Sequence, residues 1–213
     1  MDRNAKLQEI AELRARIDQL EAELSAPDAG AAARVHGWQP SGYYTTYYAT
    51  AGFMLGMFGA VASLLVNIVG AQLTGRFPLE LIRVYLTFPL GEKALELKSG
   101  PDDGLTLLIG CCLYIGTGML LGIPFHLVLT RFAADGGLPK RLIVATVLAV
   151  AVWLINFYGI LSWLQPMLFG GNWIVEGIPI WVAVLTHLVF GWTMALVYPW
   201  GLYKPYRLQA ESR

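Results

Sequence analysis

Charge is scarce in this chain, and the charges it has cancel. Of its 213 residues only 14% are charged, whereas soluble domains average about 25%. The 15 basic and 15 acidic side chains leave no net charge, so composition gives no reason for attraction to nucleic acid or to acidic substrates. We therefore expect no nucleic-acid partner.

Thiols and catalytic motifs are equally few. The two cysteines, Cys111 and Cys112, are neighbours whose side chains point apart, which argues against a disulfide between them and leaves no metal site. The sequence contains no His-Glu-x-x-His motif, no Gly-x-Ser-x-Gly elbow and no phosphate-binding loop. These absences favour a protein that is not an enzyme, and we predict no cofactor and no metal.

Four long apolar stretches occupy most of the remaining sequence. They cover residues 49–75, 105–130, 142–164 and 178–198. About 20 helical residues cross a hydrocarbon core of ~30 Å, and each stretch is at least that long. Because backbone groups find no water there, the stretches must be helices. The predicted fold is all-α: a bundle of four transmembrane helices in a membrane domain at 43–208, followed by a tail at 209–213.

Basic residues indicate how the spans are oriented. They occur in the N-terminal segment, in the C-terminal tail and between the second and third spans, whereas the last link, residues 165–177, has none. The positive-inside rule then places both termini in the cytoplasm. The link between the first two spans carries four basic residues and fits less well. We expect a multi-pass protein of a bacterial-type inner (plasma) membrane, inserted by its first span.

An amphipathic helix is predicted over residues 1–26. Its apolar residues recur at alternating intervals of three and four, the period of a coiled-coil seam: Ile10, Leu13, Ile17, Leu20 and Leu24. The a and d residues favour a parallel pair, in which Glu9 would face Arg14 and Arg16 would face Glu21. Three heptads are marginal alone, so pairing with a second copy and docking on another protein both stay open. Residues 27–42 are expected to form a tether.

The segment at 77–98, between the first two spans, predicts two short helices. Pro78 suits a first helical turn, Pro89 and Gly91 interrupt the pattern, and a second turn follows at 92–97. We expect both to lie at the outer membrane face, as an anchor or a docking platform. A cluster of tyrosines leads into the first span and indicates the opposite interface: Tyr43, Tyr44, Tyr47 and Tyr48.

Small residues indicate where helices approach closely. Gly52 and Gly56 are four residues apart in the first span, and Gly118 and Gly122 repeat that spacing in the second. Such spacing lets helix backbones touch, either within the chain or with another subunit. Pro124, inside the second span, predicts a kink.

Two histidines are the candidates for cofactor binding inside the spans. His187 lies near mid-depth of the fourth span, and His126 lies near the cytoplasmic end of the second. At ~1.5 Å per residue their depths differ by about 7–10 Å, which disfavours a haem held between them. We expect His187 to hydrogen-bond across helices, with Asn67 and Asn156 among the other polar groups of the spans.

The favoured function is a noncatalytic subunit or scaffold of a multi-protein membrane complex, for which an energy-transducing complex is a plausible host. Its partners would be the lipid bilayer, other membrane-protein subunits and, through the N-terminal helix, either those subunits or a second copy of the chain. A small homo-oligomeric channel or carrier is the first alternative. A redox or haem-binding subunit is the second.

Overall fold

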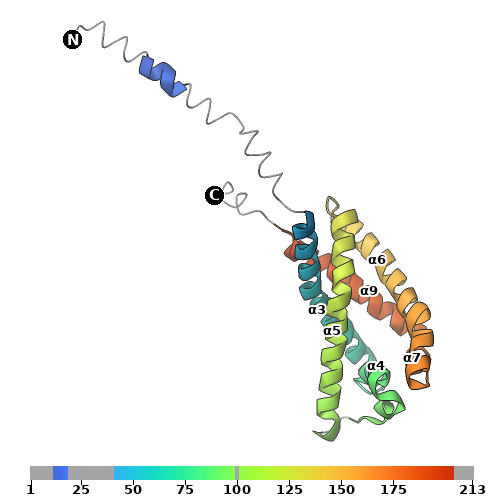
Figure 1. Cartoon of the computed structure of the whole chain (residues 1–213). Helices are drawn as coiled ribbons and strands as arrows, with labels where there is room; N and C mark the ends of the chain where they lie inside the picture. Colours follow the sequence, from blue (N-terminus) through green and yellow to red (C-terminus); the bar gives the residue numbers. More distant parts are fainter. Residues whose placement is uncertain (1–11, 19–40, 99–100, 204–213) are drawn as a thin grey trace, which may run out of the picture. The chain divides into compact units, whose positions relative to one another are not determined.

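Four long helices form the membrane domain, as the sequence predicts (Figure 1). The computed structural model describes residues 12–18, 41–98 and 101–203, and every regular element in that part of the chain is helical. The helices that are long and apolar enough to cross a membrane are Tyr44–Leu73, Asp102–Phe132, Leu138–Phe169 and Ile180–Gly201. The second and third extend past the predicted apolar stretches at both ends, because helices continue beyond the hydrocarbon core into the polar interface.

The elements of the membrane domain follow one another in the order α3 (Ser41–Leu73), α4 (Glu80–Leu90), η1 (Gly91–Glu96), α5 (Pro101–Phe132), α6 (Leu138–Leu154), η2 (Ile155–Leu161), α7 (Ser162–Phe169), α8 (Trp173–Gly177), α9 (Ile180–Val197) and η3 (Tyr198–Gly201). The third span therefore consists of α6, η2 and α7, and the fourth of α9 with η3.

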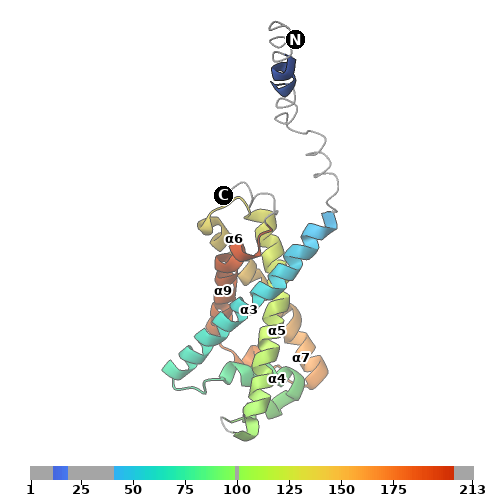
Figure 2. The same cartoon turned by 90° about the vertical axis from the view of Figure 1, so that its left-hand side faces the viewer.

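Helices α3 and α5 cross where both lack side chains (Figure 2). A Cβ atom at Gly52 would lie 2.6 Å from the carbonyl oxygen of Gly122, and one at Gly56 would overlap the carbonyl oxygen of Gly118. All four glycines are buried. The two small-residue faces therefore meet inside the chain, with backbone against backbone.

Helices α6 and α9 form a second closely packed pair. A Cβ atom at Gly191 would lie 3.1 Å from the methyl carbon of Ala149 and 3.0 Å from the carbonyl oxygen of Ala145, so the helices are in contact there. Trp192 adds a polar link, since its indole N–H donates to the Thr146 hydroxyl at 2.9 Å. The third and fourth spans are thereby fixed to each other.

The third span is continuous but not uniform. Between α6 and α7 it contains η2, a π-helix, and the N–H of Ser162 donates to the carbonyl of Phe157 five residues back. π-helices are rare and are frequently found at functional sites. Helix α5, by contrast, stays α-helical through Pro124.

The two short helices predicted between the first two spans are α4 and η1. Helix α4 is packed on two faces: Ile82 is fully buried in a cluster with α3 and α5, and Val84 is buried against η2, α8 and α9. Arg83 is also held within the fold, donating to the Glu80 carboxylate at 3.2 Å and to the Leu95 carbonyl. Helix α4 therefore closes one end of the bundle (Figure 2).

The N-terminal helix belongs to a separate unit of the chain. Residues 12–18 are helical, and the side chains of Leu13 and Ile17 are 59% and 54% exposed. Ile10, Leu20 and Leu24 lie outside the described residues, as does most of the tether. The pairing of the heptad seam stays a prediction.

Candidate functional site

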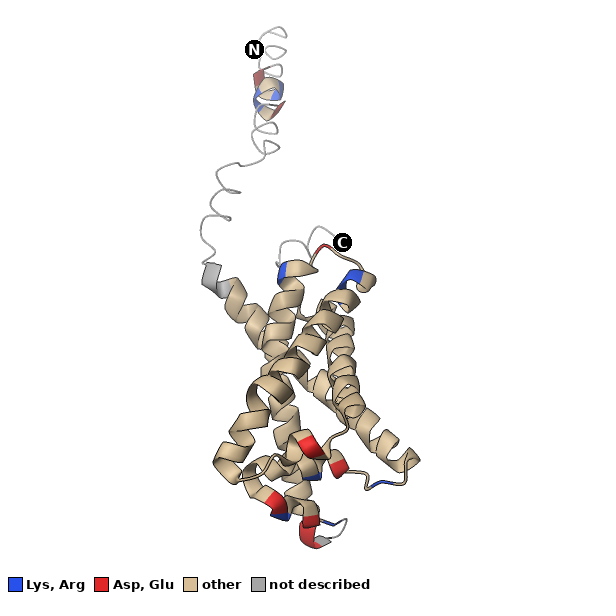
Figure 3. Cartoon of the chain, turned by 90° about the vertical axis from the view of Figure 1, so that its right-hand side faces the viewer, with Lys and Arg blue, Asp and Glu red and all other residues tan. Residues whose placement is uncertain are grey.

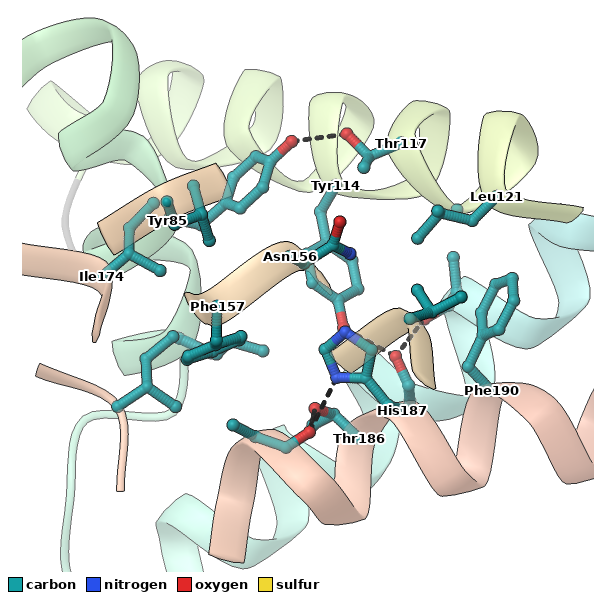
Figure 4. A pocket seen from close by; sticks show the side chains of 18 of the residues that line it. Tyr85, Tyr114, Thr117, Leu121, Asn156, Phe157, Ile174, Thr186, His187 and Phe190 are labelled. Atoms are coloured by element: carbon teal, nitrogen blue, oxygen red, sulfur yellow. Dashed lines mark hydrogen bonds between the residues drawn. The ribbon is translucent and has the colours of Figure 1, made fainter. Parts of the chain in front are cut away.

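A cavity of about 490 Å³ lies within the membrane domain, between α5, η2 and α9 (Figure 4). Its wall is mainly aliphatic and aromatic, and residues of α3, α4, α6 and α8 complete it. Apolar cavities of about 300–1,000 Å³ with a few well-placed polar groups are typical of small-molecule sites. The polar groups on this wall therefore decide what the cavity does.

Hydroxyl groups on the wall are paired with one another. Ser63 of α3 and Tyr114 of α5 share a hydrogen bond of 2.6 Å. Tyr85 of α4 and Thr117 of α5 share one of 2.5 Å. These two hydrogen bonds hold α3 and α4 against α5, so both hydroxyl pairs have a structural role.

Asn156 and His187 differ, because each has polar atoms without a partner among the described residues. The Asn156 amide, on η2, makes no hydrogen bond and is half-buried at the cavity wall. His187, on α9, donates from Nδ1 to the Ala183 carbonyl at 2.7 Å, since a carbonyl only accepts. Nε2 of the neutral ring is then an acceptor facing the cavity. Figure 4 shows both side chains directed into the space between α5 and α9.

The hydrogen bond of His187 differs from the one expected from sequence. It runs to the carbonyl four residues back in the same helix and does not cross to another helix. The physical reason is proximity, because a helix presents that carbonyl to the side chain whatever the neighbouring spans supply. The edge of the ring that carries Nε2 therefore faces the cavity.

His126, on α5, is buried outside the cavity. It is fully buried, its Nε2–H donates to the Gly201 carbonyl at 3.3 Å, and its ring centroid lies 5.2 Å from that of Tyr198 and 5.8 Å from that of Tyr48. Nδ1 of His126 is buried with no hydrogen-bond partner among the described residues.

The two histidines are too far apart to ligate one iron. Tyr198, which contacts His126, is eleven residues beyond His187 on the fourth span, or about 16 Å at 1.5 Å per residue. Two axial imidazoles need a common depth. This separation is larger than the 7–10 Å expected from sequence, because His126 packs against Tyr198, at the end of the fourth span.

Other polar candidates are scattered. In the part of the chain that the structure describes, no three His, Cys, Asp or Glu side chains gather as a metal site requires. Cys111 and Cys112 are free thiols. The tyrosines at the start of α3 pack against the end of the fourth span: the ring centroids of Tyr44 and Tyr47 each lie 5.4 Å from that of Tyr203.

Gln165 is a buried polar residue that sequence analysis missed. Its Nε2 donates to the Thr87 hydroxyl at 2.9 Å, and its Oε1 accepts the backbone N–H of Ile174 at 3.0 Å. Both side chains of the Gln165–Thr87 pair are fully buried. The amide thus joins α7, α4 and α8 beside the cavity. Its role was hidden because Gln165 directly follows the predicted third span and was assigned to a surface link.

The polar groups with unpartnered atoms on the cavity wall are the Asn156 amide and the His187 imidazole. An amide and an imidazole can donate and accept hydrogen bonds, but no carboxylate, thiol or amine stands among the described residues that line it. The chain matches no protein-family model, no curated protein and no solved structure.

Proposed function

We propose that this protein is a noncatalytic subunit or scaffold of a multi-protein membrane complex. The observation that carries the proposal is the apolar stripe of the N-terminal helix, where Leu13 and Ile17 are each more than half exposed. Burying a leucine or isoleucine side chain gains about 1.5–3 kcal/mol, so a helix with such a stripe gains from a partner surface. The membrane domain would anchor that partner at the bilayer.

We place both termini in the cytoplasm of a bacterial-type inner membrane. Arg131, Lys140 and Arg141 flank the α5–α6 connection, and the opposite end carries acidic residues together with the basic residues of the link between the first two spans (Figure 3). Arg83, one of the basic residues that fitted the positive-inside rule less well, has internal partners in Glu80 and Leu95. These placements support a cytoplasmic α5–α6 connection.

Two kinds of partner fit the stripe. In a parallel pair of copies, Glu9 would face Arg14 and Arg16 would face Glu21, which favours self-pairing. Three heptads are marginal in water, but attachment to a membrane raises the local concentration of the helices. Another subunit of the complex is the other partner, and the experiment below separates the two.

The test is native mass measurement of the full-length protein extracted in mild detergent. We expect the wild type to carry a second copy or a co-extracted subunit, and the Ile17→Lys, Leu20→Lys variant to lose it while still inserting. Ala11→Lys with Ala15→Lys is the matched control, because these residues lie on the outer face of the predicted seam. A wild-type monomer at every detergent concentration would overturn the proposal.

A small homo-oligomeric channel or carrier is the second candidate. It is favoured by the presence of Asn156 and His187 on one cavity, as a polar pathway would need. Asn67 does not line that cavity and donates its amide to the Ser63 carbonyl at 2.8 Å instead. Solute flux through reconstituted liposomes, compared between wild type and Asn156→Leu, tests this candidate. Absence of flux in the wild type counts against it.

A further inference from the structure

We propose that the cavity binds a bilayer-soluble molecule whose flat ring carries hydroxyl or carbonyl oxygens, the chemistry of lipid quinols and quinones. The proposal is independent of the partner of the N-terminal helix. It rests on an apolar cavity of about 490 Å³ and on the unpartnered polar atoms of Asn156 and His187.

The opening of the cavity indicates where a ligand comes from. Leu113 on α5 and Ile160 on η2 line the cavity and are nevertheless 46% and 38% exposed. The cavity therefore opens between the second and third spans, on a surface that faces hydrocarbon. A ligand that enters there must dissolve in the bilayer, which excludes ions and sugars.

The polar atoms specify the functional group. The Asn156 amide both donates and accepts, so it can bind a carbonyl or a hydroxyl oxygen. His187 Nε2 only accepts when Nδ1 carries the hydrogen, so it is matched to a hydroxyl donor. An unpartnered amide in an apolar setting is costly, and a ligand oxygen would remove that cost.

The shape of the wall favours a ring. Tyr114, Phe157 and Phe190 project aromatic side chains into the lining from three different spans (Figure 4). Planar rings pack well edge-on or offset against such side chains. A phospholipid acyl chain would fill the same volume but has no oxygen for Asn156 or His187, and it is therefore an outcome that the test must distinguish.

The π-helix is a second, independent feature of the cavity. η2 carries Asn156 and Phe157, and both line the cavity. Its wider turn places them one residue out of the register that an uninterrupted α-helix would give. Such π turns recur at functional sites because they re-aim side chains at a modest cost in backbone bonding.

The experiment titrates decylubiquinol and decylubiquinone against the full-length protein in nanodiscs and follows bound ligand by native mass spectrometry. We expect saturable binding, tighter for the quinol. Asn156→Leu should weaken both forms about tenfold, whereas His187→Leu should weaken the quinol about tenfold and the quinone less than twofold. Asn67→Leu is the matched control, because its amide is paired within α3 away from the cavity, and it should leave both affinities unchanged.

A variant at the opening keeps the proposal testable if a polar variant fails to fold. Leu113→Trp should narrow the opening and reduce binding of both forms, while Leu108→Trp, on an exposed residue of α5 outside the lining, should not. The proposal is overturned if the wild type shows no saturable binding. It is equally overturned if phospholipid alone occupies the protein, or if all variants bind alike.

Discussion

Helix α5 is packed in opposite ways on its two sides. Toward α3 it presents Gly118 and Gly122, and the two backbones touch. On its other side, Leu113 and Leu121 line a cavity of about 490 Å³. The same helix therefore takes part in a backbone-to-backbone contact with α3 and supplies one wall of the cavity.

The difference shows that a cavity persists where its walls are fixed by contacts made elsewhere. The third span is fixed to the fourth by Gly191 against Ala149, and α7 is fixed to α4 by the amide of Gln165. With α5 locked against α3, neither wall can move inward to fill the space without breaking a buried contact. Dense packing around the cavity thus preserves it.

The largest loss of stability is expected from substitutions at the glycine contact between α3 and α5. A Cβ atom at Gly122 would overlap the Gly52 carbonyl oxygen, so Gly122→Leu must separate α3 from α5 and should lower the free energy of unfolding by about 3 kcal/mol. Gly116→Leu, on the same helix with open space around its Cβ position, should change it by no more than about 0.5 kcal/mol. Unfolding in mixed SDS micelles measures both.

Equal stability of the two glycine variants would contradict the backbone contact between α3 and α5. In that case α5 would not be fixed against α3 and could shift toward η2.

A smaller loss of stability is expected when the hydrogen bonds that join α7 to α4 and α8 are removed. Gln165→Leu leaves the Ile174 N–H buried without its acceptor, which should cost about 1–3 kcal/mol. Gln72→Leu is the control, because Gln72 is exposed at the end of α3. Thermal unfolding in detergent compares the two, and hydrogen exchange should show faster exchange in α8 for Gln165→Leu alone. A wild-type transition in that variant would show that α7 is held by packing only.

The hydrogen bond between Ser63 and Tyr114 connects the two sides, and its contribution should be modest. Tyr114→Phe and Ser63→Ala are each expected to cost about 0.6–1.7 kcal/mol, the range for side-chain hydrogen bonds within membranes. A double-mutant cycle in SDS unfolding isolates the pair. Strict additivity of the two losses would show that the bond does not hold α3 to α5.

The smallest effect concerns His187, on the cavity side. His187→Leu should cost only about 0.6 kcal/mol, because the Ala183 carbonyl keeps its own backbone hydrogen bond in α9. His187→Gln should stay within about 0.5 kcal/mol of wild type, since an amide can still donate to that carbonyl. SDS unfolding of both variants is the measurement. A loss of several kcal/mol in either would mean that His187 is a structural support of the domain.

Hydropathy and length were enough to predict the four spans, because only a helix satisfies its backbone inside a bilayer. The glycine pairs also indicated close helix contact, but their spacing does not say which helix they meet, and the structure pairs Gly52 with Gly122. A spacing pattern of this kind predicts that a helix makes a close contact. It does not identify the partner helix.

The cavity could not be predicted, since an unfilled volume depends on the relative positions of several helices. No residue in the stretch at 155–161 signals a π-helix, and Asn156 stood among several polar candidates with equal claims. Gln165 was missed because polarity near the end of a span normally indicates exposure. His187, a candidate from sequence, lines the cavity, while its hydrogen-bond partner was predicted wrongly.

The π-helix makes the cavity depend on the length of the chain. An α-helix bonds each N–H four residues back and η2 bonds five back, so this turn holds one residue more than its α-helical equivalent. Deleting a single codon from the stretch at 155–161 would remove that extra residue and restore an α-helix, with α6 and α7 close to their present relative orientation. Only the side chains of the turn would be redirected, so Asn156 would lose its direction into the cavity while every span kept its hydropathy. Among descendants of a common ancestor, a one-residue gap in this turn would therefore separate chains that keep the polar site from chains that keep only the membrane scaffold.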